Sequence, residues 1–288
     1  MAKEHKYGLR DFKRDFPTDE ACLALIFDTL HSRKCSCGGT YHLRNGRRQF
    51  QCSKCRYHIA PTAGTIFHKS DTPLTLWFSA IRVFSNAKSG ISAKQMEREL
   101  NVTYKTAWRI LNRIRKAVEQ DDDKLKGDVE IDEAFFGGKG SAGKDNKDLS
   151  KVMKKKTVVL AAVERGGKMR AKTAPDTSSY SISKFAVKNI DPIGTRLMTD
   201  GSNKYVSTAY GYDHHFVNHR KKEFVRGDIH INHIESFWSH VKRSIKGTHK
   251  VISKRHLQSY LDGFVFHYNN RGNDNARFSV LLGALLHA

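Results

Sequence analysis

The sequence lacks several features that mark common protein classes. No apolar run approaches the ~18 residues that a membrane-spanning helix needs, and the first residues lead into no apolar segment of the signal type. A P-loop, a dinucleotide-binding glycine fingerprint and a nucleophile elbow are also missing, so no ATP is implied. We therefore expect no membrane partner and a cytoplasmic location.

Acidic residues are scarce in this chain. The 29 Asp and Glu residues face 51 Lys and Arg residues, which leaves a formal charge of +22 at pH 7 and a pI near 9.8. So large an excess predicts a polyanionic partner, with nucleic acid as the leading candidate and association with the nucleoid as a consequence. A solvated basic surface without a ligand is the alternative. The hydrophobic share of 39% is enough for packed cores, in one large domain or two to three small ones.

Cysteine is also rare, with five in the chain, and disulfides are uncommon in the cytoplasm. Cys22 lies at an apolar position of an expected helix, so we interpret it as a small buried residue. The other four form two close pairs, on either side of a hairpin-length stretch: Cys35 and Cys37, then Cys52 and Cys55. This spacing predicts a structural zinc site, although the first pair has one intervening residue where two are usual. Four unrelated thiols are the alternative.

Basic residues crowd the same small module, which we place at residues 1–62. Arg47 and Arg48 follow the expected hairpin turn at Asn45-Gly46. We expect these two arginines to contact the DNA phosphate backbone. A solvated rim around the zinc module is the alternative.

Residues 63–126 predict a helical domain that contains a helix-turn-helix. Ser92 should cap its first helix, Asn101 should take the left-handed position in the turn, and Thr103 should cap the second helix. The outward side of the second helix suits a DNA groove, and it carries Tyr104, Lys105, Arg109 and Arg113. Plain helical packing with a basic outer face is the alternative.

From residue 127 the pattern changes to strands alternating with helices, and a hairpin comes first. This order predicts an α/β fold, with a mixed sheet of the ribonuclease H-like type at residues 127–288 and helices at its end. The glycine- and lysine-rich stretch 137–156 is expected to be a mobile loop. In the strand 129–132, apolar residues alternate with Glu130 and Asp132, so both carboxylates should lie on one face.

Two further acids complete a candidate metal site. Asp200 follows a predicted strand, and Glu235 lies in a predicted helix at 232–246. If they converge with Asp132, the three carboxylates form an oxygen-only pocket for a divalent metal. The alternatives are an exposed strand acid for Asp132, a helix cap for Asp200, and a surface ion pair for Glu235.

The Glu235 helix carries other candidate functional residues. Lys242, Arg243 and Lys246 are predicted to hold DNA phosphates. Trp238 is expected to pack in the core, with stacking on a flipped base as the alternative.

The motifs together resemble the insertion-sequence transposases with a DDE triad, in particular the ISXO-like group. The resemblance rests on VEIDEAFFGGK around Asp132, LMTDG around Asp200, NHIESFWSHVKR around Glu235, and Tyr268-Asn269-Asn270-Arg271. The cysteine pairs, the Gly64-Thr65-Ile66-Phe67 segment with Trp77, and the expected helix-turn-helix are similar to the amino-terminal half of that group. The resemblance therefore extends over nearly the whole chain.

This resemblance implies an activity and its cofactors. The chain would bind the terminal repeats of its element in double-stranded DNA, and then cut and join strands with two Mg²⁺ ions, or Mn²⁺ in their place. Asp132 would bridge both metals, Asp200 would hold one, and Glu235 the other. Synapsis of two ends implies at least a homodimer. The alternatives are a DNA-binding regulator derived from a transposase that has lost catalysis, and a ribonuclease H-like repair nuclease that cuts without joining.

Overall fold

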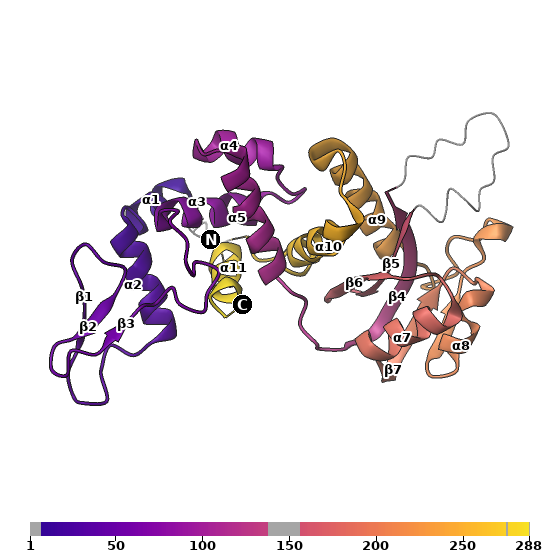
Figure 1. The fold of residues 1–288 in the computed structure, drawn as a ribbon. Helices are drawn as coiled ribbons and strands as arrows, with labels where there is room; N and C mark the ends of the chain where they lie inside the picture. The colour runs from indigo at the N-terminus through magenta and orange to yellow at the C-terminus, as the bar shows by residue number, and fades with distance from the viewer. Residues whose placement is uncertain (1–6, 138–155, 275, 288) are drawn as a thin grey trace, which may run out of the picture. The chain divides into compact units, whose positions relative to one another are not determined.

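The protein is described here from a computed structural model, which covers residues 7–137, 156–274 and 276–287. The chain divides into two compact units (Figure 1). The first contains the chain up to Val118 together with the residues from Gly272 onward, and the second is Glu119–Arg271. None of the helices in the described ranges has the length and apolarity that crossing a bilayer demands.

The first unit contains a small antiparallel sheet and a set of helices. Its elements are α1 (Leu9–Asp15), α2 (Asp19–Leu30), β1 (Tyr41–Leu43), β2 (Phe50–Cys52), β3 (His58–Ile59), α3 (Leu74–Asn86), α4 (Ala93–Leu100), α5 (Tyr104–Ala117) and α11 (Arg277–Leu286). The strand order is β1-β2-β3. Phe27 of α2 stacks on Phe50 of β2 with ring centroids 4.0 Å apart, so α2 supplies the apolar surface that so small a sheet cannot build alone.

Helices α4 and α5 begin and end where the local sequence predicts. The Ser92 hydroxyl accepts a hydrogen bond from the Gln95 N–H, and the Thr103 hydroxyl accepts one from the Thr106 N–H. Asn101 adopts the left-handed conformation, with φ 51° and ψ 48°. This conformation reverses the chain between the two helices at a residue type that tolerates it.

The closing helix α11 belongs to the first unit, which corrects the expectation that it lies with the catalytic domain. Phe278 packs edge-on against Phe12, with centroids 5.5 Å apart, and also contacts Phe78. Arg277 donates to the backbone carbonyl of Ser85 in α3. The apolar face of α11 is therefore covered by α1 and α3, which come from the other end of the sequence.

The second unit begins before residue 127, the expected boundary. The Gln120 side chain donates to the Ala171 carbonyl at 2.8 Å and to Asp262 at 2.7 Å, and it accepts from the Ala171 N–H at 2.9 Å. Arg170, almost fully buried, donates to Asp121 and to the Asp123 carbonyl. These contacts attach residues 120–123 to the edge of the sheet that follows.

The second unit is built on a mixed five-stranded sheet in the order β6-β5-β4-β7-β8. Its elements are β4 (Leu125–Phe136), β5 (Thr157–Glu164), β6 (Met169–Ala174), α7 (Ser179–Asn189), β7 (Ile190–Thr199), the 3₁₀ turn η1 (Asn203–Tyr205), α8 (Val206–Ala209), β8 (Asp213–Phe216), the 3₁₀ turn η2 (His219–Lys221), α9 (Asn232–Ser244), the π-helical turn η3 (Ile245–His249) and α10 (Lys254–Asn269). Strand β4 runs antiparallel to β5 and parallel to β7, and β5 and β6 form the predicted hairpin.

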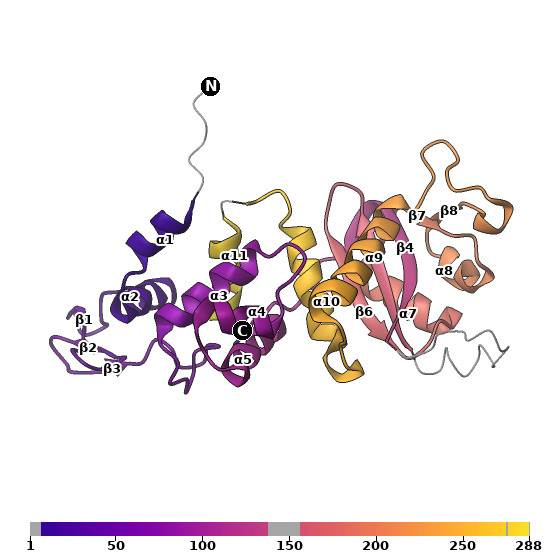
Figure 2. The same ribbon diagram turned by 90° about the horizontal axis from the view of Figure 1, so that it is seen from above.

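Helices cover both faces of this sheet (Figures 1 and 2). Val129 and Ile131 point to the face covered by α7, whereas Ala134 and Phe136 point to the face covered by α9 and α10. The alternation along β4 thus separates two cores. The expected loop at 137–156 lies, except for its two end residues, outside the described residues.

Candidate active site

Asp132 lies in β4, four residues before the end of that strand, and Asp200 directly follows the end of the neighbouring parallel strand β7. In the register of β4 and β7, Glu130 is opposite Met198. The pairing ends at these two residues, and Asp200 lies close enough to Asp132 for its negative charge to raise the pKa of Asp132. Parallel pairing brings together two acids that are distant in the sequence.

Helix α9 reaches the same place through Trp238. Its indole N–H donates to Oδ2 of Asp132 at 3.1 Å, and its ring is 4% exposed and contacts Phe136. Trp238 thus packs in the core, as expected. Glu235 precedes Trp238 by three residues, so both side chains lie on the same face of α9, one turn apart. The contact between Trp238 and Asp132 therefore holds α9 against β4, with Glu235 one turn before the contact. The carboxylate oxygens of Asp132, Asp200 and Glu235 do not all lie within 4.8 Å of one another.

The surroundings of Asp132 disfavour its negative charge. Its pKa is raised to about 7, chiefly by burial and then by the negative charges of Glu133 and Asp200, against the Lys204 ammonium, which lowers it. A carboxyl in this state releases its proton when a cation compensates the charge. The electrostatic environment of Asp132 therefore favours binding of a cation by its carboxylate.

Lys204 is a residue that the sequence analysis missed. Its ammonium donates to Glu133 and lies 3.9 Å from Oδ2 of Asp200. Glu133 also accepts from the Tyr205 hydroxyl at 2.7 Å, on the α7 side of the sheet. The only sequence signal was the spacing of four residues between Asp200 and Lys204, which is common in helices and pointed to no site.

Glu235 lies in the first turn of α9, and its side chain is 48% exposed. Its Oε1 atom is 3.8 Å from Nδ1 of His219 in η2. An exposed carboxylate that is not committed to a buried network keeps its oxygens accessible to a ligand. The three acids therefore occupy different environments: Asp132 is largely buried, Asp200 accepts the Ser202 N–H at 3.0 Å, and Glu235 faces solvent.

Glu130 holds the start of α9 in place. Its carboxylate is fully buried and accepts hydrogen bonds from the backbone N–H groups of His233 and Ile234, at 2.9 and 3.1 Å. Ile231 is at the N-cap position of α9 and makes no side-chain cap bond. A strand residue thus satisfies the free N–H groups of the helix and places negative charge at the positive end of its dipole.

Arg165 completes this buried network. Its guanidinium donates to Glu130 at 2.9 Å, to the Asp228 carbonyl at 2.7 Å and to the His230 carbonyl at 2.9 Å. Glu130, His230 and His233 are close enough together to form a metal site. Arg165 already supplies the compensating positive charge, however, so we assign the three residues to the anchoring of α9. The alternation in β4 predicted the orientation of Glu130 but not its role.

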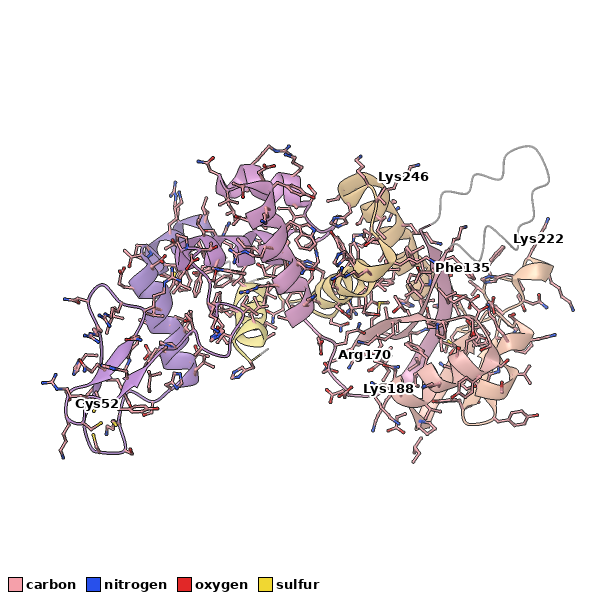
Figure 3. The ribbon with its side chains drawn as sticks, in the orientation of Figure 1. Cys52, Phe135, Arg170, Lys188, Lys222 and Lys246 are labelled. Atoms are coloured by element: carbon pink, nitrogen blue, oxygen red, sulfur yellow. The ribbon has the colours of Figure 1, made fainter. Side chains whose placement is uncertain are left out.

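The four predicted zinc ligands come together at the base of β1 and β2, where Figure 3 labels Cys52. The Sγ atoms of Cys35 and Cys55 are 3.7 Å apart, those of Cys37 and Cys52 are 3.5 Å apart, and all four lie within 4.8 Å of one another. Four sulfurs about 2.3 Å from one tetrahedral zinc are roughly 3.8 Å apart. The single residue between Cys35 and Cys37 is therefore compatible with a four-thiolate site.

Two further features support metal binding by these cysteines. A hydrogen bond from the Tyr41 hydroxyl lowers the pKa of Cys35 to about 6, and the backbone N–H of Cys55 lowers the pKa of Cys52. The pKa of Cys55 is instead raised to about 12, because hydrogen bonds with Cys37 and Cys52 outweigh the lowering effect of the Tyr57 backbone N–H. Thiolates are the form that binds zinc. At Gly39, a Cβ would lie 2.5 Å from Sγ of Cys52, so only glycine permits this close turn. Cys22 is buried in α2, away from the group, as expected.

The candidate DNA-binding residues fall into two groups. Arg48, Arg109 and Arg113 donate to the chain's own segment 66–72, with partners that include the Ser70 carbonyl, the Thr72 hydroxyl and the Ile66 carbonyl. The remaining candidates are exposed: Arg47, Tyr104, Lys105, Lys242, Arg243 and Lys246. Helical periodicity predicted an outward face. It did not reveal that Arg48, Arg109 and Arg113 make hydrogen bonds within the chain.

The comparisons with known proteins indicate a transposase. Residues 124–269, just over half of the chain, match the family described as "ISXO2-like transposase domain". The chain therefore belongs to the ISXO2-like transposase family. It is also 28% identical over 229 residues to "Uncharacterized protein in transposable element ISH50" of Halobacterium salinarum, and the match covers 75% of this chain and 77% of that protein.

Solved structures give a weaker match. "Crystal structure of a pre-cleavage Mos1 transpososome" is similar at a TM-score of 0.29, and "Crystal structure of the Mos1 Strand Transfer Complex" at 0.31. Each is 10% identical over 72% of this chain, covering 78% and 76% of those chains, respectively. TM-scores this low do not establish a common fold.

Proposed function

We propose that the chain is a DDE transposase that binds the ends of its own element in double-stranded DNA, then cuts the DNA and joins the released strands to a target. Asp132, Asp200 and Glu235 are its catalytic acids, with two Mg²⁺ ions or with Mn²⁺ in their place. The fold of residues 127–271 is ribonuclease H-like in this proposal. Pairing of two ends requires at least a homodimer.

The observation that supports the proposal most is the closeness of Asp132 to Asp200 and to helix α9. The negative charge of Asp200 raises the pKa of Asp132, and the Trp238 indole of α9, one turn beyond Glu235, donates to Asp132. Carboxylate oxygens are the ligands that Mg²⁺ prefers, and the raised pKa of Asp132 indicates negative charge that needs compensation. The donor set therefore fits a divalent cation.

The bound metal and the residues around it have different functions in the proposed reaction. Bound Mg²⁺ supplies activation of the attacking oxygen and stabilisation of the leaving oxygen of a phosphodiester. Trp238 orients the Asp132 carboxylate through its N–H, and Glu130 fixes the turn of α9 that carries Glu235. Lys204 offers a positive charge beside Asp200. The exposed Lys242, Arg243 and Lys246 extend along α9 and η3, where DNA phosphates would bind.

The first unit provides DNA recognition in this proposal. A zinc ribbon formed by residues 1–62 contacts phosphates through Arg47, and a helix-turn-helix within residues 63–126 presents Tyr104 and Lys105 to a groove. Arg48, Arg109 and Arg113 contribute to this surface indirectly, because their hydrogen bonds hold residues 66–72 in place.

The test is incubation of the full chain with the flanking DNA of its own gene and Mg²⁺, with cleavage mapped to the nucleotide. We expect Asp132→Asn to leave binding to the ends unchanged and to lower cleavage by about 10³-fold or more, because an amide is a poor ligand for the metal. Asp191→Asn, at an acid paired with Lys126, should leave both unchanged. Equal loss of binding and cleavage in Asp132→Asn would make Asp132 structural. Binding by the wild type without cleavage in Mg²⁺ or Mn²⁺ would favour a regulator.

A further inference from the structure

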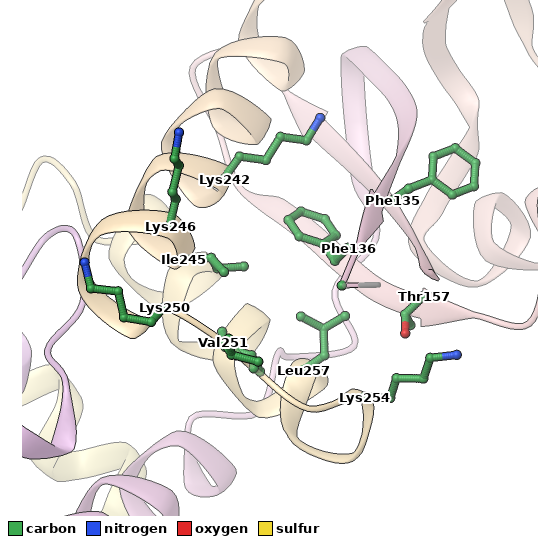
Figure 4. Close-up of a pocket in the computed structure, with 12 residues that line it drawn as sticks. Phe135, Phe136, Thr157, Lys242, Ile245, Lys246, Lys250, Val251, Lys254 and Leu257 are labelled. Atoms are coloured by element: carbon green, nitrogen blue, oxygen red, sulfur yellow. The ribbon is translucent and has the colours of Figure 1, made fainter. Parts of the chain in front are cut away.

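A hollow of about 380 Å³ lies within the second unit, between the end of β4, the π-helical turn η3 and the start of α10 (Figure 4). Its apolar lining includes Phe136 and Leu257, which are 6% and 3% exposed, together with Ile245. These side chains belong to the core that α9 and α10 form on the sheet, so the hollow has a preformed floor.

Four lysines surround this floor. Lys242, Lys246, Lys250 and Lys254 come from α9, η3, the following residue and α10, and Figure 4 shows them around Phe136, Ile245 and Leu257. None of the described residues that line the hollow is acidic. Four like charges around an apolar floor repel one another unless an anion lies between them. The site therefore suits a ligand with a flat apolar part and attached negative charges.

The backbone beside the hollow is unusual. The regular α-helix gives way to the π-helical turn Ile245–His249, and Lys250 then takes a positive φ of 64°. Both features are uncommon in proteins and concentrate at functional sites. Val251 follows at the mouth of the hollow with 83% of its surface exposed, so it makes little contribution to the core.

We propose that this hollow receives one unpaired nucleotide of DNA, whose base lies on the apolar floor while the adjoining phosphates lie among the lysines. A nucleotide combines the two properties that the site selects, since every base has an apolar face and every linkage carries a negative charge. The volume lies at the low end of ligand pockets, ~300–1,000 Å³, which suits one nucleotide and excludes a folded segment.

The position of the hollow agrees with the proposed reaction, on which this inference rests. Phe136 is four residues beyond Asp132 along β4, a distance of about 13 Å at ~3.3 Å per residue. That distance corresponds to about four stacked nucleotides of ~3.4 Å each, and to fewer where the strand is unstacked. A base held there would fix the strand near the phosphate that reacts.

The experiment measures DNA binding by fluorescence anisotropy in EDTA, with no cleavage involved. Two labelled duplexes of the same sequence are compared, one fully paired and one with a single unpaired nucleotide. We expect the wild type to bind the unpaired form about tenfold more tightly, because covering one face of the base with the apolar floor removes apolar surface from water. Val251→Trp, which fills the mouth, should reduce this preference to less than about twofold without weakening binding of the paired duplex.

Matched controls separate this effect from general damage. Ile193 is 84% exposed and lies far along the sheet from the hollow, in β7, so Ile193→Trp should keep the full preference. Lys254→Ala should lower affinity for the unpaired duplex and reduce the slope of log affinity against log salt by about one, whereas Lys188→Ala on α7 should not.

The outcomes are decisive and independent of catalysis. No preference in the wild type, or an undiminished preference in Val251→Trp, would overturn the pocket. Asp132→Asn should keep the preference while losing cleavage. A protein that prefers the unpaired nucleotide but never cuts its own ends would support the pocket and refute the proposed transposase reaction.

Discussion

The two candidate metal sites assemble their ligands in opposite ways. The four cysteines lie within a short stretch, in which Cys35 and Cys55 are 20 positions apart, and their sulfurs are already gathered. The acids of the second unit come from two strands and a helix, and the contact between Trp238 and Asp132 spans 106 positions. The cysteine site depends on local turns, whereas the acidic site depends on long-range packing.

This difference indicates whether each metal would contribute to folding or to chemistry. Sulfur ligands in a module with little core would make zinc part of the folding energy. The acids lie on a sheet with cores on both faces, so we expect the second unit to fold without metal. Metal at the acids would then serve chemistry alone.

Breaking the anchor of α9 should damage the long-range site without removing any proposed ligand. Glu130→Gln leaves Arg165 without its buried partner and turns an amide N–H toward backbone donors, so we expect a loss of about 3–5 kcal/mol in the free energy of unfolding. Cleavage by the folded fraction should also fall. Chemical denaturation and cleavage assays measure both effects. Asp191→Asn breaks a surface pair with Lys126 and should cost about 1 kcal/mol or less. Equal effects of the two variants would show that Glu130 is no anchor.

Removing one sulfur should affect the local site alone. Cys52→Ser should weaken zinc binding by about 100-fold, on the order of 3 kcal/mol of the ~10–16 kcal/mol that four ligands provide. Metal analysis and amide exchange should show zinc loss and an unprotected segment 34–59, with β4 and β5 still protected. Cys22→Ser, at an equally buried thiol, should keep the metal. A Cys52→Ser protein that retains zinc would refute the site.

A substitution at Gly201 tests the conformation of the chain that follows Asp200. Its φ is +71°, and a Cβ there would lie 2.6 Å from the Phe216 ring and 3.0 Å from the Val217 carbonyl oxygen. Gly201→Ala should therefore cost about 2 kcal/mol or more and lower cleavage, because the chain after Asp200 must shift. Gly166→Ala has a similar φ but open space, so it should cost only about 1 kcal/mol. Thermal unfolding of both variants at one pH distinguishes the clash from the conformational cost.

Without bound metal, the raised pKa of Asp132 should make the second unit less stable as the pH rises. Its pKa in the folded protein is about 7, above the ~3.9 of an unfolded chain, so the folded state binds more protons between these values. Stability is therefore lost from about pH 4 to pH 7. In EDTA at pH 8, Asp132→Asn should raise the free energy of unfolding by about 1–2 kcal/mol, and at pH 4 it should change little. A variant that is less stable than the wild type at pH 8 would contradict this environment for Asp132.

Much of the local structure was predictable. The caps at Ser92 and Thr103, the left-handed Asn101, the β5–β6 hairpin and the helix that carries Glu235 follow from side-chain caps, turn chemistry and apolar periodicity. These signals act within a few residues, so the sequence displays them directly. The expected position of the closing helix was wrong because an apolar helix face does not specify which surface will cover it.

The chain alone determined a strong positive charge, two neighbouring pairs of thiols and a strand with both acids on one face, because composition, spacing and a period of two are properties of local sequence. Only the tertiary structure decided that the charge of Asp200 reaches Asp132, that Glu130 caps α9, and that Arg48, Arg109 and Arg113 have partners within the chain. Those contacts join residues far apart along the chain. Their formation depends on which packed arrangement of the whole unit offsets the loss of conformational entropy, and no short stretch of sequence contains that information.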